Sequence, residues 1–264
     1  MARPKKLVSG GADQVAVMEE GGVRTLHIGG HAIQSAIRLS APESLELEYT
    51  RAMMAFLLLC PEPRDILMIG LGGGSIARFV HARLPDARMT VVEISPSVVN
   101  VARHYFGLPA DDSRLQVVVA DGAVWVPAHP GSAQVLLIDG FEDGKQPTAL
   151  CSAAFYENAF KALRPGGLMV VNFMAEDRRL DAYIERIRTV FNGRTLMLSA
   201  QDNVNLIILA FKGGPARLGW ETLRNRARAQ QRALGLPTAY YLSSLRELNP
   251  HSGSYLRVAA ESEA

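Results

Sequence analysis

The sequence predicts a doubly wound α/β fold built on a mostly parallel sheet of seven strands. From residue 65 onward, short apolar runs alternate with stretches of helical periodicity, which is typical of this fold class. The runs are rich in β-branched residues, as expected of parallel strands covered on both faces. Four glycines between residues 70 and 74 join the first of these strands to a helix. These features indicate a Rossmann-like sheet.

Strands and helices of the main sheet are expected in alternating order. Ser95 suits the N-cap of one helix, with Pro96 at its first helical position. The Arg-Pro-Gly-Gly sequence at 164–167 ends another helix and turns into the next strand. The expected strands are 66–69, 89–94, 115–120, 135–138, 168–173, 196–198 and 206–211, and the expected helices are 75–83, 95–104, 153–163 and 181–191.

The first 60 residues have a different pattern. Two apolar runs, 15–18 and 23–28, flank Glu-Glu-Gly-Gly and predict a β-hairpin. A short strand at 32–37 and a helix over 43–59 are expected to follow. We therefore expect a small antiparallel element with a lead-in helix over residues 1–60 and a Rossmann-like domain over residues 61–264.

Composition excludes several classes of protein. The formal net charge of +2 requires neither nucleic acid nor a membrane surface as a partner. Arginines in segment 215–234 have no interleaved aromatic residues, which favours a solvated helix face over a nucleic-acid patch. Two cysteines cannot build a disulfide framework, and the longest apolar run, 52–60, is too short to span a membrane. A cytoplasmic protein is expected.

The glycine-rich turn is the first candidate site. Gly70, Gly72, Gly73 and Gly74 allow close approach of the backbone to a ligand, and the following helix offers unpaired N–H groups. This pattern favours a nucleotide or nucleoside ligand over a simple tight turn. Because Ser75 replaces the third glycine of G-x-G-x-x-G, the spacing alone does not select a particular nucleotide.

Acidic residues at the ends of three strands make the prediction more specific. Glu93, Asp121 (followed by Gly122) and Asp139 should all lie along the carboxyl edge of the sheet, where such sheets bind ligands. A nicotinamide cofactor accounts for Glu93, which would bind ribose, but not for the other two. An S-adenosyl sulfonium compound accounts for all three acids. Because Gly29-Gly30 separates His27 from His31, a metal pair is not favoured, and no metal is expected.

At these residues the sequence resembles the spermidine synthase (polyamine aminopropyltransferase) family. The similar segments are the glycine loop 70–74, Val-Val-Glu-Ile at 91–94, Asp121-Gly122 and Asp139. The resemblance implies a class I S-adenosylmethionine-dependent transferase sheet and, as donor, decarboxylated S-adenosylmethionine. It further implies a small-molecule amine acceptor, a homodimer, a donor contact from Gln34 and a substrate contact from Tyr49.

Three departures from the family pattern concern the substrates. Gly73 stands where family members carry an aspartate whose implied role is to hold the donor's ammonium group. The family's Tyr-His-Glu is Tyr-Thr-Arg at 49–51, and the acceptor loop contains Glu142, Asp143 and Lys145. Glu142 and Asp143 are predicted to form either an acidic rim that attracts a polyamine or a solvated turn.

Asp139 is the candidate catalytic group, since a carboxylate beside a cationic donor can orient an amine and deprotonate it. A structural role, capping the following turn, is the alternative for this residue. Two other functions stay open at this point. One is methyl transfer from S-adenosylmethionine itself, which the absence of a carboxylate at Gly73 favours. The other is nucleoside binding without catalysis.

Overall fold

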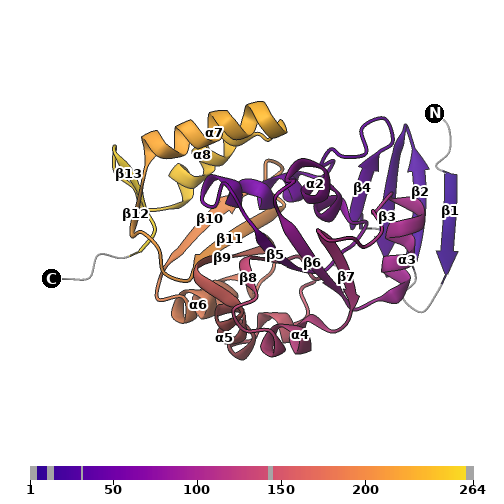
Figure 1. Ribbon diagram of the computed structural model, residues 1–264, viewed down its shortest axis with the longest axis horizontal. Coiled ribbons are helices and arrows are strands. Elements are labelled where there is room, and N and C mark those ends of the chain that lie inside the picture. Colours follow the sequence, from indigo (N-terminus) through magenta and orange to yellow (C-terminus); the bar gives the residue numbers. More distant parts are fainter. Residues whose placement is uncertain (1–4, 11–14, 31, 142–144, 260–264) are drawn as a thin grey trace.

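The computed structural model describes residues 5–10, 15–30, 32–141 and 145–259. It contains a seven-stranded central sheet, a four-stranded N-terminal sheet and a small two-stranded sheet near the C-terminus. Figure 1 shows the N-terminal sheet at one end of the molecule and the C-terminal helices near the other, with the central sheet between them.

The central sheet has the strand order β10-β11-β9-β8-β5-β6-β7. The five strands from β9 to β7 are parallel, whereas β11 runs antiparallel to both β9 and β10. This confirms the predicted doubly wound, mostly parallel sheet. The strands are β5 (Asp65–Ile69), β6 (Arg88–Glu93), β7 (Leu115–Val119), β8 (Ala133–Ile138), β9 (Leu163–Met174), β10 (Thr195–Ser199) and β11 (Asn205–Phe211).

Helices cover both faces of this sheet because its strands are apolar on both faces. One face packs against α2 (Ser75–Arg83), α7 (Trp220–Leu234) and α8 (Thr238–Leu248). The other packs against α4 (Gly122–Ala128), α5 (Ala153–Ala162) and α6 (Leu180–Val190), which lie together on one side in Figure 1. Neighbouring residues of a strand alternate between the two layers: Met68 belongs to the first core and Leu67 to the second.

The N-terminal sheet is antiparallel and contains the predicted hairpin. Its strands, in order, are β1 (Lys5–Gly10), β2 (Val15–Glu20), β3 (Val23–Ile28) and β4 (Ser35–Arg38). Helix α3 (Pro96–Tyr105) connects the two sheets, since Val98 and Val101 pack on the N-terminal sheet while Val99 packs on the central sheet. The N-terminal sheet is thereby fixed against the main fold.

The lead-in helix is shorter than the predicted 43–59. The structure has α1 (Glu48–Met53), continued by a 3-10 helix, η1 (Met54–Leu58). Leu45 and Glu46 precede the helix, and their carbonyl groups accept hydrogen bonds from the Arg51 guanidinium. The division of the chain at residue 60 stays a prediction.

The arginine-rich C-terminal segment forms β12 (Arg217–Gly219) and α7. Strand β12 pairs with β13 (Tyr255–Arg257), and a second short 3-10 helix, η2 (Thr148–Cys151), precedes α5. Arg224, Arg228 and Arg232 are exposed, in agreement with the prediction of a solvated helix face, whereas Arg226 is half-buried and donates to the Leu58 carbonyl oxygen. In the described part of the chain, no helix is both long and apolar enough to cross a membrane.

Candidate active site

The predicted site residues that the structure describes lie at or beside the carboxyl edge of the central sheet. The glycine loop follows β5, which has β6 on one side and β8 on the other, so the chain changes direction of winding at this strand. This is the position at which doubly wound sheets bind ligands. Glu93 ends β6, Asp139 follows β8, and Asp121 lies two residues beyond the end of β7. The sequence therefore predicted the edge and three of its acids.

The glycine loop is held close to the neighbouring strand. Gly70 has φ of +92°, and a Cβ built there would lie 2.3 Å from the carbonyl oxygen of Asp139. Only glycine combines this backbone conformation with this approach. Gly74, at the N-cap of α2, has φ of +72°. The lack of side chains at Gly70 and Gly74 therefore lets the loop pack closely against the residues that follow β8 and α3.

Glu93 connects the glycine loop to the start of α3. Its side chain is 8% exposed, with Oε2 accepting from the Leu71 amide (2.8 Å) and Oε1 from the Ser95 amide (2.9 Å). These bonds fix the carboxylate's orientation at the ligand edge. A carboxylate has about four lone-pair sites, so its two oxygens can accept from more than two donors.

Asp121 and Gly122 begin helix α4. The exposed Asp121 is the N-cap, and its Oδ1 accepts from the Ala123 amide at 2.8 Å. A Cβ at Gly122 would lie 2.4 Å from Ile69 Cγ2, so this glycine lets the helix approach β5 closely. Exposed apolar residues adjoin the two acids Glu93 and Asp121 in sequence: Ile94 (68%), Val119 (52%) and Val124 (69%). These three were not predicted from the sequence as site residues.

Asp139 lies in an environment that perturbs its pKa. Burial raises the pKa of Asp139 to about 7 and the nearby charge of Glu93 contributes to the rise, whereas the Asn172 amide and the neighbouring Tyr49 hydroxyl act in the opposite direction. The Asn172 Nδ2 donates to Asp139 Oδ1 at 2.9 Å. A carboxyl group with a near-neutral pKa suits proton transfer. The sequence offered one signal for Asn172: a polar residue within the apolar strand β9.

Tyr49 lies beside Asp139 and also contacts Gln34. Its hydroxyl donates to the backbone carbonyl of Gln34 at 3.0 Å. Burial and the neighbouring Asp139 raise the pKa of Tyr49 well above its ordinary value, so the phenol stays protonated. Gln34 thus contributes its main chain to this contact. Both residues were predicted to belong to the site, and the structure brings them together.

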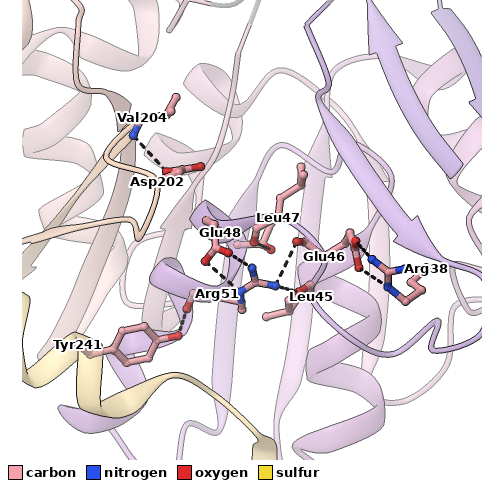
Figure 2. Close-up of polar contacts among 10 residues, drawn as sticks. Arg38, Leu45, Glu46, Leu47, Glu48, Arg51, Asp202, Val204 and Tyr241 are labelled. Atoms are coloured by element: carbon pink, nitrogen blue, oxygen red, sulfur yellow. Dashed lines mark hydrogen bonds and ion pairs between the residues drawn. The ribbon is translucent and has the colours of Figure 1, made fainter. Parts of the chain in front are cut away.

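The helix that carries Tyr49 is anchored from several directions (Figure 2). Arg51 forms an ion pair with Glu48, and the Tyr241 hydroxyl of α8 donates to the Arg51 carbonyl oxygen. Arg38 of the N-terminal sheet forms a second ion pair, with Glu46. Arg51 therefore stabilises the segment before α1. Figure 2 shows the ion pairs of Arg38 and Arg51 along one stretch of chain, with Tyr241 of α8 beside Arg51.

The structure leaves no space for a side chain at Gly73. A Cβ there would lie 2.9 Å from Ser35 Cβ and 3.0 Å from the Phe106 ring, and the Gly73 amide donates to Ser35 Oγ at 2.8 Å. The N-terminal sheet and the residue that follows α3 thus occupy the space beside Gly73, the position at which the resembled family carries an aspartate. Glu142 and Asp143, predicted to bind substrate, lie outside the described residues. Among the described residues, no three His, Cys, Asp or Glu side chains gather into a metal-binding group.

The fold and site define a nucleotide-binding α/β protein with a carboxyl group suited to proton transfer beside its glycine loop. Comparison with known proteins narrows this class. The family model described as spermine/spermidine synthase domain matches residues 46–192. A polyamine aminopropyltransferase of Chromobacterium violaceum is 40% identical over 245 residues, covering 93% of this chain and 94% of that protein. The chain belongs to the spermine/spermidine synthase family and is a transferase.

Solved structures agree with this fold. A probable spermidine synthase from Corynebacterium glutamicum covers 100% of this chain and 99% of its own, with a TM-score of 0.69 and 21% identity. At that identity the likeness concerns the fold alone. Human methyltransferase-like protein 13 in complex with SAH is 28% identical, covering 72% of this chain and 94% of its own, with a TM-score of 0.66.

Proposed function

We propose that this enzyme transfers an aminopropyl group from decarboxylated S-adenosylmethionine to a small-molecule amine. The observation that carries the proposal is Asp139, a carboxyl group of near-neutral pKa beside the glycine loop. The 40% identical relative named polyamine aminopropyltransferase supports the same reaction. The resemblance to the family supports a dimer in the cytoplasm, and light scattering of the purified chain tests the dimer.

The donor's nucleoside is assigned to the three acids and the loop. Glu93 would accept from the ribose hydroxyls, since two backbone amides fix its carboxylate at the ligand-binding edge of the sheet. Asp121 and Gly122 would lie beside the adenine amino group. Ile94, Val119 and Val124 offer exposed apolar surface for the adenine ring. The backbone of Gly70, Gly72, Gly73 and Gly74, together with Gln34, would line the rest of the donor site.

The reaction is a direct displacement at the carbon next to the sulfonium sulfur. The acceptor's nitrogen forms a bond to that carbon, the carbon–sulfur bond breaks, and the electron pair neutralises the sulfur. Asp139 in its ionised form takes the proton that the amine must lose. Asn172 donates to that carboxylate and Tyr49 lies beside it, which would orient the carboxylate toward the amine. Glu142 and Asp143 are proposed to attract the cationic acceptor.

Methyl transfer from S-adenosylmethionine is the second candidate, because position 73 has no carboxylate to hold an ammonium group or to repel the methionine carboxylate. Calorimetry with S-adenosylmethionine, its decarboxylated form and methylthioadenosine separates the two functions. We expect the decarboxylated donor to bind at least about tenfold more tightly than S-adenosylmethionine, a difference of about 1.4 kcal/mol. The reverse preference supports methyl transfer, and binding of none of the three contradicts the whole S-adenosyl assignment.

Glu93→Ala tests the ribose assignment. The change removes the acceptor for two ribose hydroxyls and also releases the Leu71 and Ser95 amides. Hydrogen bonds to charged groups contribute about 1.5–3 kcal/mol each, so donor affinity should fall at least about tenfold by calorimetry. Glu157→Ala, at an exposed acid of α5, is the matched control and should leave donor affinity unchanged. Normal affinity in the Glu93 variant refutes the assignment.

A further inference from the structure

Two buried asparagines lie in the apolar strands beside Asp139. Asn172 of β9 is 1% exposed and Asn205 of β11 is 6% exposed. A buried amide without hydrogen bonds is strongly destabilising, so each of these side chains needs partners. The partners they have form a chain. Asn205 Nδ2 donates to Asn172 Oδ1 at 2.9 Å, and Asn172 Nδ2 donates to Asp139 Oδ1 at 2.9 Å.

The direction of this chain follows from its last member. An ionised carboxylate only accepts hydrogen bonds, so Asn172 must turn its NH₂ group toward Asp139. Its amide oxygen then faces away from Asp139 and needs a donor. Asn205 supplies that donor. If the Asn172 amide turned over, its oxygen would face the carboxylate oxygen, and its NH₂ group would face the NH₂ group of Asn205. The Asn205 contact therefore selects the orientation of Asn172 that binds Asp139.

Strand register brings the three residues together. In the β8–β9 pairing Ile138 lies opposite Val171, so the next residues, Asp139 and Asn172, are neighbours. In the β9–β11 pairing Ile207 lies opposite Asn172, which puts Asn205 on the same face of the sheet, two residues further along. The backbone carbonyl of Asn172 also accepts from the Gln146 side chain. Asn172 is thus held through both its side chain and its main chain.

We propose that Asn205 is a positioning residue of the transfer reaction, which acts through Asn172 to hold one oxygen of the Asp139 carboxylate in place. The other carboxylate oxygen is then directed to the acceptor amine. This inference rests on the proposed function, in which Asp139 takes the proton of the amine. Besides Asn172, the groups that act on Asp139 in the described chain are Tyr49 of α1 and Glu93 of β6. Both act on Asp139 itself, whereas Asn205 reaches it through Asn172.

Loss of the Asn205 donor should therefore change the protonation of Asp139. In Asn205→Leu the Asn172 amide is free to turn, so its bond to the ionised carboxylate weakens. Because that bond lowers the pKa of Asp139, its weakening raises the pKa. We expect the acidic limb of the kcat–pH profile to move upward by about half to one pH unit. Turnover should fall about three- to tenfold at about pH 6.5 and recover at about pH 9, where the carboxylate is ionised in both proteins.

Asn249→Leu is the matched control. Asn249 is also a buried asparagine, 7% exposed, but it bonds to the main chain of Met197 and Leu245 on the β10–α8 side. It should alter stability without moving the acidic limb. If Asn205→Leu fails to fold, Asn205→Ser replaces it. In addition, Asn205→Leu should add no further shift in an Asn172→Leu background, because the effect passes through Asn172.

Titration of the Asp139 carboxyl carbon by NMR separates this inference from the proposed function. The signal is assigned by its disappearance from the spectrum of Asp139→Asn. An upward shift of that titration in the Asn205 variant supports the positioning role even if Asp139 proves unimportant for turnover. An unmoved titration and an unmoved acidic limb in a folded Asn205 variant overturn it. A shift of equal size in Asn249→Leu also overturns it, because the effect would then be a general one.

Discussion

Replacing Asp139 with asparagine should abolish turnover and leave donor binding intact. Asparagine retains the shape and an oxygen that accepts from Asn172, but it cannot take a proton from the amine. Positioned general bases contribute about 10²–10⁴-fold, so kcat should fall by about that factor. Steady-state rates measure the loss, and calorimetry with the decarboxylated donor measures the binding. An unchanged rate would remove Asp139 from the mechanism.

The same residue predicts two opposite dependences on pH. Turnover of the native enzyme should rise through about pH 7, where Asp139 ionises. The contribution of Asp139 to the free energy of unfolding decreases as the pH rises. A carboxyl group whose pKa is raised by folding stabilises the fold below its unfolded pKa of about 4, and this contribution is lost as the pH rises through about 7. The melting temperature of Asp139→Asn, measured relative to that of the native chain, should therefore be higher at about pH 8 than at about pH 5.

Replacing Gly70 with alanine should abolish donor binding and destabilise the chain. The φ of +92° is unfavourable for alanine, and the new Cβ would lie 2.3 Å from the Asp139 carbonyl oxygen, a backbone atom that cannot move aside alone. Relief requires the glycine loop and β8 to separate, which moves Asp139 away from the donor. We expect a loss of about 3 kcal/mol of unfolding free energy. Donor affinity should fall at least about a hundredfold by calorimetry.

Gly107→Ala is the control for this prediction. Gly107 also has a positive φ, +65°, but a Cβ there meets no atom within 4 Å. The backbone cost alone is about 1–2 kcal/mol, and donor affinity should be unchanged. A Gly70→Ala protein that binds donor as the native chain does would show that the close approach of loop and strand is not needed.

The central sheet could be predicted because its strands carry their signal locally. The helix expected at 75–83 has those bounds in the structure, since the glycine loop marks its start. Helix α4 was not predicted, because its seven residues include Pro127 and depend on the Asp121 cap and the packing against Ile69. Strands β12 and β13 were missed for a related reason. Each is three residues long, and the two are far apart in the sequence.

For the candidate site too, the residues with a local sequence signal were predicted, and those that depend on distant contacts were not. Glu93, Asp121 and Asp139 follow buried strands closely, so sequence order alone predicts that they share one edge of the sheet. The contacts of Asn172 and Asn205 depend on the register between β9 and β11, which the sequence does not reveal. Likewise, the space beside Gly73 is filled by Ser35 and Phe106, which are both distant from Gly73 in the sequence. For Asn172 the sequence offered one signal, a polar residue within an apolar strand. That signal marks the residue but does not reveal which residues it bonds to.

The bond between Ser35 and the Gly73 amide has a consequence for how such enzymes can be recombined. Ser35 begins β4 of the N-terminal sheet, and Ser75, directly after the glycine loop, reaches the Ala36 carbonyl oxygen of that strand at 3.3 Å. The N-terminal sheet is thus one wall of the proposed donor site. In a chimaera that takes its N-terminal sheet from one relative and its glycine loop from another, the side chain at position 35 and the loop residue at position 73 would come from different proteins. Their packing and hydrogen bond would then not be matched. The residue at 73 and the residue at 35 should therefore be exchanged as a pair.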